Sequence, residues 1–323
     1  MDGILRCFHP LSVRATCGGG HAGPGLRCEY QVILGYLRVF GSGPIREARG
    51  MDRPVDFFLV GCQKSATTWL HRCFREHPDV YVPEEDELHY FDIHYDRGDD
   101  WYHRYYHESS GEKHLGDTTS SYIRSPYVPR RIAGYNPDAQ IIVSLRNPVE
   151  RAFSHYWHER KKKKIAFEFE EIFSNYDLFE SWIATGFYDE HLKRYYDHFD
   201  ENQVLVLIFE DLREDSSSFI REVFSFLGVD PEFQPSVLDQ TVNSAWYRLF
   251  GADRFKEKAI NVLTEPINVL SNSAAARMRD YFRPESEYER GMDAETRSRL
   301  QSIYRPHVSA LEDQLGRSLK NWT

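Results

Sequence analysis

The stretch "DFFLVGCQKSATTWLHRCF", residues Asp56 to Phe74, contains the local pattern that decides the fold. It begins with a short apolar run of the kind found in buried strands, and Gly61 interrupts that run. The residues that follow predict a helix whose buried face comprises Trp69, Leu70, Cys73 and Phe74. A strand, a tight loop with one lysine and a helix together form a suitable binding site for an anion, typically a phosphate.

The loop differs from that of nucleoside triphosphatases, which have the pattern G-x-x-x-x-G-K-[ST]. Gly61 permits a sharp turn, after which backbone amides and the positive end of the helix dipole would face an anion. Lys64 adds a point charge, and Thr67 and Thr68 add hydroxyl donors in the first helical turn. The alternative is an ordinary helix start, capped by Ser65 or Thr67, beside a solvated lysine.

The composition is that of an ordinary globular protein. The chain has 323 residues, of which 41% are hydrophobic and 28% charged, enough for one large α/β core or two smaller ones. The formal charge of -10 argues against a general nucleic-acid binder, although it permits a local basic pocket. Five cysteines without C-x-x-C spacing favour a reducing compartment, and Cys62 and Cys73 are interpreted as core residues.

No apolar run approaches the roughly 20 residues of a transmembrane helix, and no clear secretory signal is present. We therefore expect a cytoplasmic protein without a transmembrane segment. Several histidines lie near carboxylates in the sequence, namely His89, His94, His103, His107 and His114. Their spacing is not that of metal ligands, so no metal is expected.

Two regions differ in texture. Residues 1–50 are rich in glycine and arginine and lack a regular apolar period. We expect a weakly ordered N-terminal extension over residues 1–50 and a single domain over residues 51–323. The segment Pro231–Pro284 has weak periodicity, and its topology is left open.

Strands and helices alternate through the second region. Further buried strands are predicted at Ala139–Leu145 and Gln203–Leu212, and Asn147 is a good N-cap for the helix after the first of them. Other helices are predicted over Tyr188–Phe199, before Gly228, and near the C-terminus as two pieces split at Pro306 and ended by Gly316. This alternation predicts an α/β fold with a central parallel sheet and helices on both faces.

A second strand end also contains residues suited to an anion. Arg146 follows the strand that ends at Leu145, and Ser154 lies two turns into the next helix. Ligands of parallel sheets bind at the carboxyl ends of the strands, where an arginine can bind phosphate through two hydrogen bonds. The two loops together predict a ligand with two separate phosphate groups.

These motifs resemble those of a known family. "FFLVGCQKSATTWL" resembles the 5′-phosphosulfate loop of sulfotransferases, a strand followed by K-x-G-T-T-x-L, and "LRNPVERAFSHYWH" resembles their 3′-phosphate motif. "PEEDELHYFDIHYDRGDDWYHRYY" is similar to the matching segment of the heparan sulfate sulfotransferases and their bacterial relatives. The resemblance extends from Asp56 to Trp322. It implies the P-loop-like sulfotransferase fold, the donor 3′-phosphoadenosine-5′-phosphosulfate, the product 3′,5′-bisphosphoadenosine and no metal.

The resemblance also implies roles for individual residues. Those on the 5′ side of the donor would be Gly61, Lys64, Ser65, Ala66, Thr67 and Thr68. Trp69 would lie against the adenine or be a core aromatic, and both readings stay open. Arg146 and Ser154 would bind the 3′-phosphate. Lys64 would also stabilise the leaving group, and Glu87, in "EDELHYFD", would be the catalytic base, with His89 as the second choice.

The sequence departs from the family pattern in three places. Ala66 replaces a usual glycine, and we expect it to avoid positive φ. Thr118, in "GDTTSSYI", replaces a lysine near donor and acceptor, which weakens the case for a heparan-like acceptor. A cysteine-bounded loop over the donor has no counterpart, and Arg277, Arg279 or Arg283 are the alternatives for covering the 5′ side.

We expect a sulfotransferase that modifies a hydroxyl or amine of a carbohydrate, a glycolipid or another small hydroxylated acceptor, and no nucleic acid. Two alternatives remain. A P-loop nucleotide kinase or phosphotransferase would need a lysine–serine pair in the loop and a magnesium carboxylate, for which Asp211 is a poor substitute. A non-catalytic nucleotide-binding module is the other. The sequence does not indicate the acceptor or the oligomeric state.

Overall fold

A computed structural model describes residues 53–161, 167–239 and 292–322, all of which belong to the unit Ala48–Thr323. Some predictions fall outside the described residues. They are the N-terminal extension, most of the segment Pro231–Pro284, and Arg277, Arg279 and Arg283. In the part of the chain that is described, no helix is long and apolar enough to span a bilayer.

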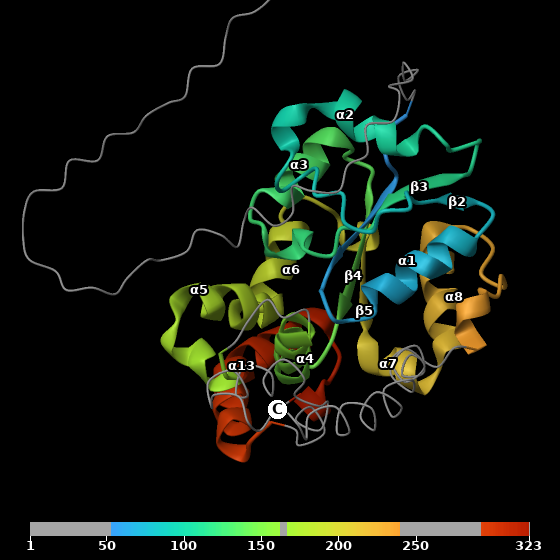
Figure 1. The fold of residues 1–323 in the computed structure, drawn as a ribbon. Coiled ribbons are helices and arrows are strands. Elements are labelled where there is room, and N and C mark those ends of the chain that lie inside the picture. The colour runs from blue at the N-terminus through green and yellow to red at the C-terminus, as the bar shows by residue number, and fades with distance from the viewer. Residues whose placement is uncertain (1–52, 162–166, 240–291, 323) are drawn as a thin grey trace, which may run out of the picture. The chain divides into compact units, whose positions relative to one another are not determined.

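The centre of the fold is a five-stranded sheet in the order β2-β3-β1-β4-β5 (Figure 1). Its strands are β1 Phe57–Gly61, β2 Val80–Tyr81, β3 His114–Asp117, β4 Gln140–Leu145 and β5 Val204–Ile208. All four pairings are parallel, which confirms the predicted fold class. The chain leaves β1 toward β2 and β3 on one side and later continues through β4 and β5 on the other. The strand order therefore reverses beside β1, the place where such sheets bind ligands.

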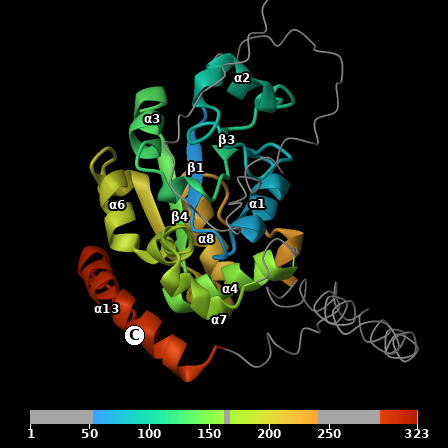
Figure 2. The same ribbon diagram turned by 60° about the vertical axis from the view of Figure 1, so that its left-hand side comes forward.

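Helices cover both faces of this sheet (Figure 1, Figure 2). They are α1 Thr67–Glu76, α2 Asp99–His103, α3 Val128–Tyr135, α4 Pro148–Lys161, α5 Tyr176–Leu178, α6 Tyr188–Tyr196, α7 Phe209–Glu214, α8 Ser216–Leu227 and α13 Ala294–Leu315. Short 3-10 turns join several of them. Helices α1 and α8 pack on one face, and α3, α4, α6 and α13 on the other.

The two faces form two hydrophobic cores, because side chains alternate along β1. Phe57 and Leu59 pack with α1 and α8, whereas Phe58 and Val60 pack into the core on the opposite face. All four side chains are fully buried. A strand that is apolar at every position is the expected pattern for a sheet covered on both sides.

The predicted break of the C-terminal helix at Pro306 is wrong, because α13 continues through this residue. An interior proline costs about 3 kcal/mol. The helix also buries Tyr304, Val308 and Leu311 against the second core, and each buried apolar side chain contributes about 1.5–3 kcal/mol. Packing therefore outweighs the cost of the proline. The predicted stop at Gly316 is confirmed by its left-handed conformation, with φ of 59°.

The predicted strand Gln203–Leu212 is too long, since β5 ends at Ile208 and α7 begins at Phe209. Glu210 and Asp211 occupy the first turn of α7, where carboxylates complement the helix dipole. An apolar run alone does not distinguish a strand from the helix that continues it. Three residues after the end of β5, Asp211 pairs with Arg317. Two hydrogen bonds of 2.6 Å join these side chains and link α7 to the C-terminal segment.

Candidate functional site

The first predicted anion loop, Cys62–Ala66, joins the carboxyl end of β1 to α1. The N-cap of α1 is Ala66, and no side chain caps the helix. The alternative of a helix start capped by Ser65 or Thr67 is therefore wrong. The first amides of α1 are left for another acceptor, as an anion site requires.

The prediction that Ala66 avoids positive φ is also wrong. Ala66 has φ 66° and ψ 19°, in the left-handed region, and Lys64 has φ 75°. A residue with a Cβ loses roughly 1–2 kcal/mol there. Neighbouring contacts hold the loop in place: the Ser144 hydroxyl donates to the Ser65 carbonyl at 2.6 Å, and Arg146 Nη1 donates to the Lys64 carbonyl at 3.2 Å.

The other predicted loop residues differ in exposure. Thr68 is exposed and Thr67 is partly exposed, so their hydroxyl groups can reach a ligand. Ser65 is fully buried, and its hydroxyl has no hydrogen-bond partner among the described residues. Trp69 is partly exposed and packs edge-on against Phe219 of α8, with ring centroids 6.1 Å apart. This contact supports the core role of Trp69 and leaves the adenine contact as a prediction.

The second predicted loop lies beside the first. Arg146 follows β4, and its hydrogen bond to the Lys64 carbonyl joins the two loops directly. Its guanidinium also lies over the Phe209 ring, 4.9 Å from the centroid. Asn147 Oδ1 accepts from the amides of Val149 and Glu150 at 3.0 and 3.3 Å, which confirms the predicted N-cap. Ser154 is partly exposed on α4.

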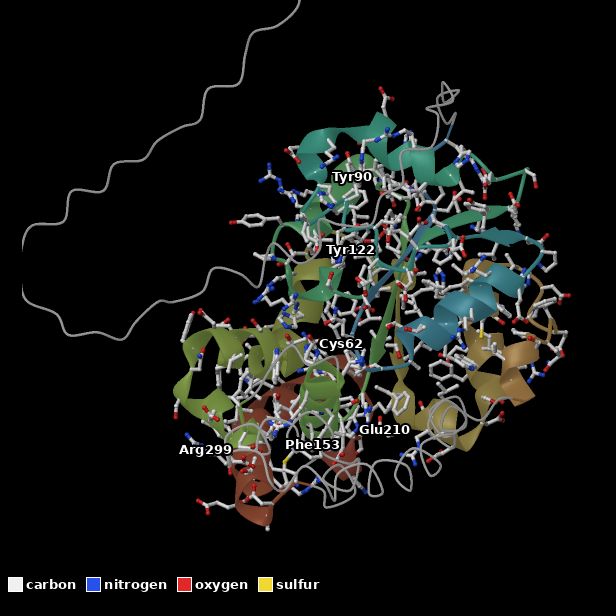
Figure 3. All side chains as sticks on the ribbon, in the orientation of Figure 1. Cys62, Tyr90, Tyr122, Phe153, Glu210 and Arg299 are labelled. Atoms are coloured by element: carbon white, nitrogen blue, oxygen red, sulfur yellow. The ribbon has the colours of Figure 1, made fainter. Side chains whose placement is uncertain are left out.

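Glu210, in the first turn of α7 directly after β5, lies at the same end of the sheet. Its Oε1 accepts from the Asn147 amide at 3.1 Å. Figure 3 shows Glu210 near the carboxyl end of β5 and Cys62 near that of β1. Three neighbouring strand ends, those of β1, β4 and β5, therefore contribute polar groups to one edge.

The predicted base belongs to a chain of three ionisable side chains. The Ser120 hydroxyl donates to Glu87 Oε1, and Glu87 Oε2 lies 3.7 Å from His89 Nε2. On its other side, His89 Nδ1 is 3.1 Å from the Asp92 carboxylate, which also accepts from the Ser121 hydroxyl at 3.1 Å. Glu87 and His89, which the sequence offered as alternative bases, are thus neighbours.

Burial and mutual charge set the pKa values in this chain. Burial raises the pKa of Glu87 to about 7, while the hydrogen bond from Ser120 and the charge of His89 oppose the rise. Burial lowers the pKa of His89, but the hydrogen bond and charge of Asp92 outweigh that effect and raise it. Burial raises the pKa of Asp92, and the interaction with His89 more than compensates, so its pKa is lowered. Glu87 is therefore poised to exchange a proton near neutral pH.

The base and the first anion loop meet at Gly61. A Cβ at this position would lie 3.0 Å from the Ser120 carbonyl and 2.6 Å from Ile123 Cγ2. Ser120 also donates a hydrogen bond to Glu87. Ser120 therefore lies between the Glu87 carboxylate and Gly61, where the first anion loop begins. The close approach, together with φ of 156° at Gly61, explains why glycine is required here.

Thr118, which replaces a lysine of the family pattern, is only 3% exposed. Its hydroxyl pairs with His71 Nδ1 at 2.8 Å and donates to the Asp86 carbonyl at 3.4 Å. The residue ties the Asp86–Glu87 segment to α1. It does not replace the charge of a lysine.

Several groups at the site were not singled out from the sequence: Ser120, Asp92, Phe209, Glu210 and Arg151. Asp92 belongs to the quoted "HYFD" segment, so its position beside His89 could have been predicted from the sequence. The others reach the site only through the sheet topology. Within the described ranges, no group of three or more His, Cys, Asp or Glu side chains could hold a metal ion. The polar groups at the carboxyl ends of β1 and β4 are cations, hydroxyls and backbone amides. These groups suit an anionic ligand.

Comparisons with known proteins identify the family of this chain and several relatives. The family described as "Sulfotransferase domain" matches residues 54–312. A bifunctional heparan sulfate N-deacetylase/N-sulfotransferase 1 of Xenopus tropicalis is 27% identical over 295 residues, or 84% of this chain and 31% of that protein. A heparan sulfate glucosamine 3-O-sulfotransferase 6 of Mus musculus is 32% identical over 199 residues, or 60% of this chain and 58% of that protein.

Among solved structures, a sulfotransferase from Alicyclobacillus acidocaldarius is similar with a TM-score of 0.63 and 26% identity. The similarity covers 84% of this chain and 99% of that one. By contrast, the match spans only 31% of the bifunctional relatives' length.

Proposed function

The chain belongs to the sulfotransferase family, and we propose that it transfers the sulfuryl group of 3′-phosphoadenosine-5′-phosphosulfate to a hydroxyl or amine of a carbohydrate or glycolipid. One observation carries this proposal. Glu87, whose pKa is raised to about 7, is tied through Ser120 to the start of an anion loop at Gly61. A base beside an anion site is the arrangement that deprotonation of an acceptor next to an activated donor requires.

The donor fits the groups at this edge of the sheet. When bound, it supplies an activated sulfuryl group whose departure leaves a bisphosphate. The uncapped amides of α1, with Thr67 and Thr68, would hold its 5′ side, and Arg146 and Ser154 its 3′-phosphate. Lys64 would offset the charge that develops on the leaving oxygen, the effect that accounts for much of the rate in such reactions.

Glu87 would take the proton of the acceptor. Oε1 is held by Ser120, and Oε2 is buried without a hydrogen-bond partner among the described residues. His89, fixed by Asp92, lies 3.7 Å from Oε2 and stabilises the carboxylate form. General-base catalysis of this kind typically contributes 10²- to 10⁴-fold to the rate.

The relatives named above support a carbohydrate acceptor, since their names specify heparan sulfate. They include both an N- and a 3-O-sulfotransferase, so an amine and a hydroxyl are both consistent with them. Thr118 is buried and supplies no cation toward a polyanionic chain. We therefore propose a hydroxylated carbohydrate or a glycolipid in place of a highly sulfated polymer.

Titration calorimetry with 3′,5′-bisphosphoadenosine, against ATP and 5′-AMP, tests the donor site. We expect tight binding of the bisphosphate alone, weakened by Lys64→Ala and by Arg146→Ala. Transfer of labelled sulfate from the donor to a panel of neutral and sulfated glycans then tests the acceptor. Equal or tighter binding of ATP, with a magnesium requirement, would replace this proposal with a nucleotide kinase.

A further inference from the structure

Arg151 is a buried arginine without a carboxylate partner. It lies on α4, and its exposed fraction is 0%. One nitrogen, Nη2, donates to the Trp182 carbonyl. The hydroxyl of Tyr304 lies beside the guanidinium, yet Nε and Nη1 have no hydrogen-bond partner of good geometry among the described residues. Nearly all buried charges in proteins are paired, so this one needs an explanation.

The charge of Arg151 acts on side chains next to both anion loops. Its charge opposes the burial effect that raises the pKa of the Cys62 thiol, and Cys62 is the first residue of the loop after β1. Tyr188 also faces this charge, and its hydroxyl donates to the Arg146 carbonyl at 2.9 Å, in the loop after β4. Figure 3 shows Cys62 near the point where the end of β1 meets α4. The charge of Arg151 thus acts on one residue of the first loop and on the side chain that supports the second.

His155 also responds to this charge, while burial raises the pKa of Tyr188 and the Glu210 carboxylate raises it further, in the opposite sense to Arg151. Burial lowers the pKa of His155, and the charges of Arg151, Lys64 and Arg124 lower it further. His155 is therefore neutral, and its Nδ1 is buried without a partner among the described residues. No carboxylate forms an ion pair with Arg151 in the described residues.

A buried charge without a carboxylate partner and with few hydrogen bonds is costly, and an arginine cannot relieve that cost by losing a proton. A bound anion does relieve it. Two anion-binding loops near such a charge would gain affinity for an anion even though the charge never touches it, because Coulomb interactions in a partly buried site extend over several ångströms.

We propose that Arg151 is a positioning residue whose buried charge draws the anionic donor onto the two loops that bind it. The inference rests on the donor site of the proposed function. It assigns Arg151 a role in donor affinity beyond that of Lys64 and Arg146, which are partly exposed and therefore partly screened by salt.

Calorimetric titration of 3′,5′-bisphosphoadenosine into Arg151→Met and Arg151→Lys tests the role. Methionine keeps the length of the side chain and removes the charge. Lysine keeps the charge and loses the planar fork. We expect affinity to fall about 10- to 100-fold in Arg151→Met, and by no more than about 3-fold in Arg151→Lys. Arg221→Met is the matched control, because Arg221 is an exposed arginine of α8 that pairs with Glu232, and its loss should leave affinity unchanged.

Steady-state kinetics separate this role from a purely structural one. Loss of the field should raise KM for the donor with kcat and the acceptor KM nearly unchanged, whereas a damaged fold would lower kcat as well. Should Arg151→Met not fold, Arg151→Lys decides alone: a loss above about 10-fold with a normal melting temperature would show that shape, not charge, matters. Equal bisphosphate affinity in wild type and Arg151→Met would overturn the proposal. Wild type that fails to bind the bisphosphate would instead refute the proposed function itself.

Discussion

The carboxyl group of Glu87 combines a raised pKa with an oxygen, Oε2, that has no hydrogen-bond partner among the described residues. Glutamine has the same shape but accepts no proton. We expect Glu87→Gln to reduce turnover by about 10²- to 10⁴-fold while donor affinity changes little. Turnover and calorimetric affinity of the purified variant check this. Glu85→Gln is the control, since Glu85 is an exposed neighbour in the same loop. A Glu87→Gln variant with near-normal turnover would exclude Glu87 as the base.

The pH dependence of the reaction follows from the same carboxyl group. Glu87 must be deprotonated to act as a base, so kcat/KM should rise with pH through about 7 and then level off. Asp92→Asn supplies an internal check: His89 loses the anion that holds its charge, Glu87 loses a cationic neighbour, and the rise should move to higher pH. Identical profiles for wild type and Asp92→Asn would contradict the coupling.

Stability should change in the opposite sense. The pKa of Glu87 is higher in the folded than in the unfolded chain, so its contribution to stability is present at low pH and is lost as pH rises through about 7. At a pH where Glu87 acts as a base, its buried carboxylate thus adds no stability to the fold, as is common for functional groups.

At the level of the first loop, Ala66 adopts a conformation that glycine adopts more readily. Its φ of 66° predicts that Ala66→Gly relieves strain. The unfolded state also gains entropy with glycine, so the net gain should be at most about 1 kcal/mol of unfolding free energy. Urea unfolding measures it, and bisphosphate affinity should stay within a factor of a few. Ala66 also packs against the core between the sheet and helices α1 and α8, so a clear loss of stability would mean that this packing outweighs the backbone strain.

The end of β1 shows the reverse case. Gly61→Ala would place a methyl group 2.6 Å from Ile123 Cγ2 and 3.0 Å from the Ser120 carbonyl, at a φ of 156°. We expect a loss of about 2 kcal/mol or more in unfolding free energy and a loss of activity, because Ser120 holds Glu87. The matched control is Gly134→Ala in α3, where a Cβ meets nothing within 4 Å and alanine should be neutral or stabilising. Equal effects of both substitutions in unfolding titrations would refute this steric account.

Elements with long apolar runs could be predicted from the sequence, and short polar ones could not. β1, β4 and the helix after Asn147 were anticipated because their burial leaves a periodic or continuous apolar pattern. β2 and β3 have two and four residues, and β3 begins with His114 and ends with Asp117. Their place in the sheet depends on partners, so no local pattern marks them. The same holds for Pro306, whose cost is local and whose compensation is tertiary.

The whole site is assembled by the sheet. Parallel strands place residues near Gly61 and Arg146 at one edge, and for that reason both anion loops could be predicted from strand ends alone. Glu87 required the family resemblance, since an acidic loop is ordinarily solvated. Arg151 could not be identified at all: its burial depends on Trp182 and Tyr304, which are distant in sequence.

The described sheet, both cores and the site all lie from residue 53 onward, and the family match begins at residue 54. We therefore propose that residues 51–323 form the catalytic unit and expect a protein that starts at Met51 to fold and to keep the donor affinity and turnover of the full chain. Calorimetry and sulfate transfer, run side by side on both proteins, measure this. The melting temperatures should agree within a few degrees, since no described contact is removed. A soluble, folded 51–323 protein that binds bisphosphate but does not transfer sulfate would show that the first 50 residues act on the acceptor, because the donor site would then be intact. Loss of both bisphosphate binding and sulfate transfer would instead show that the first 50 residues are needed for folding.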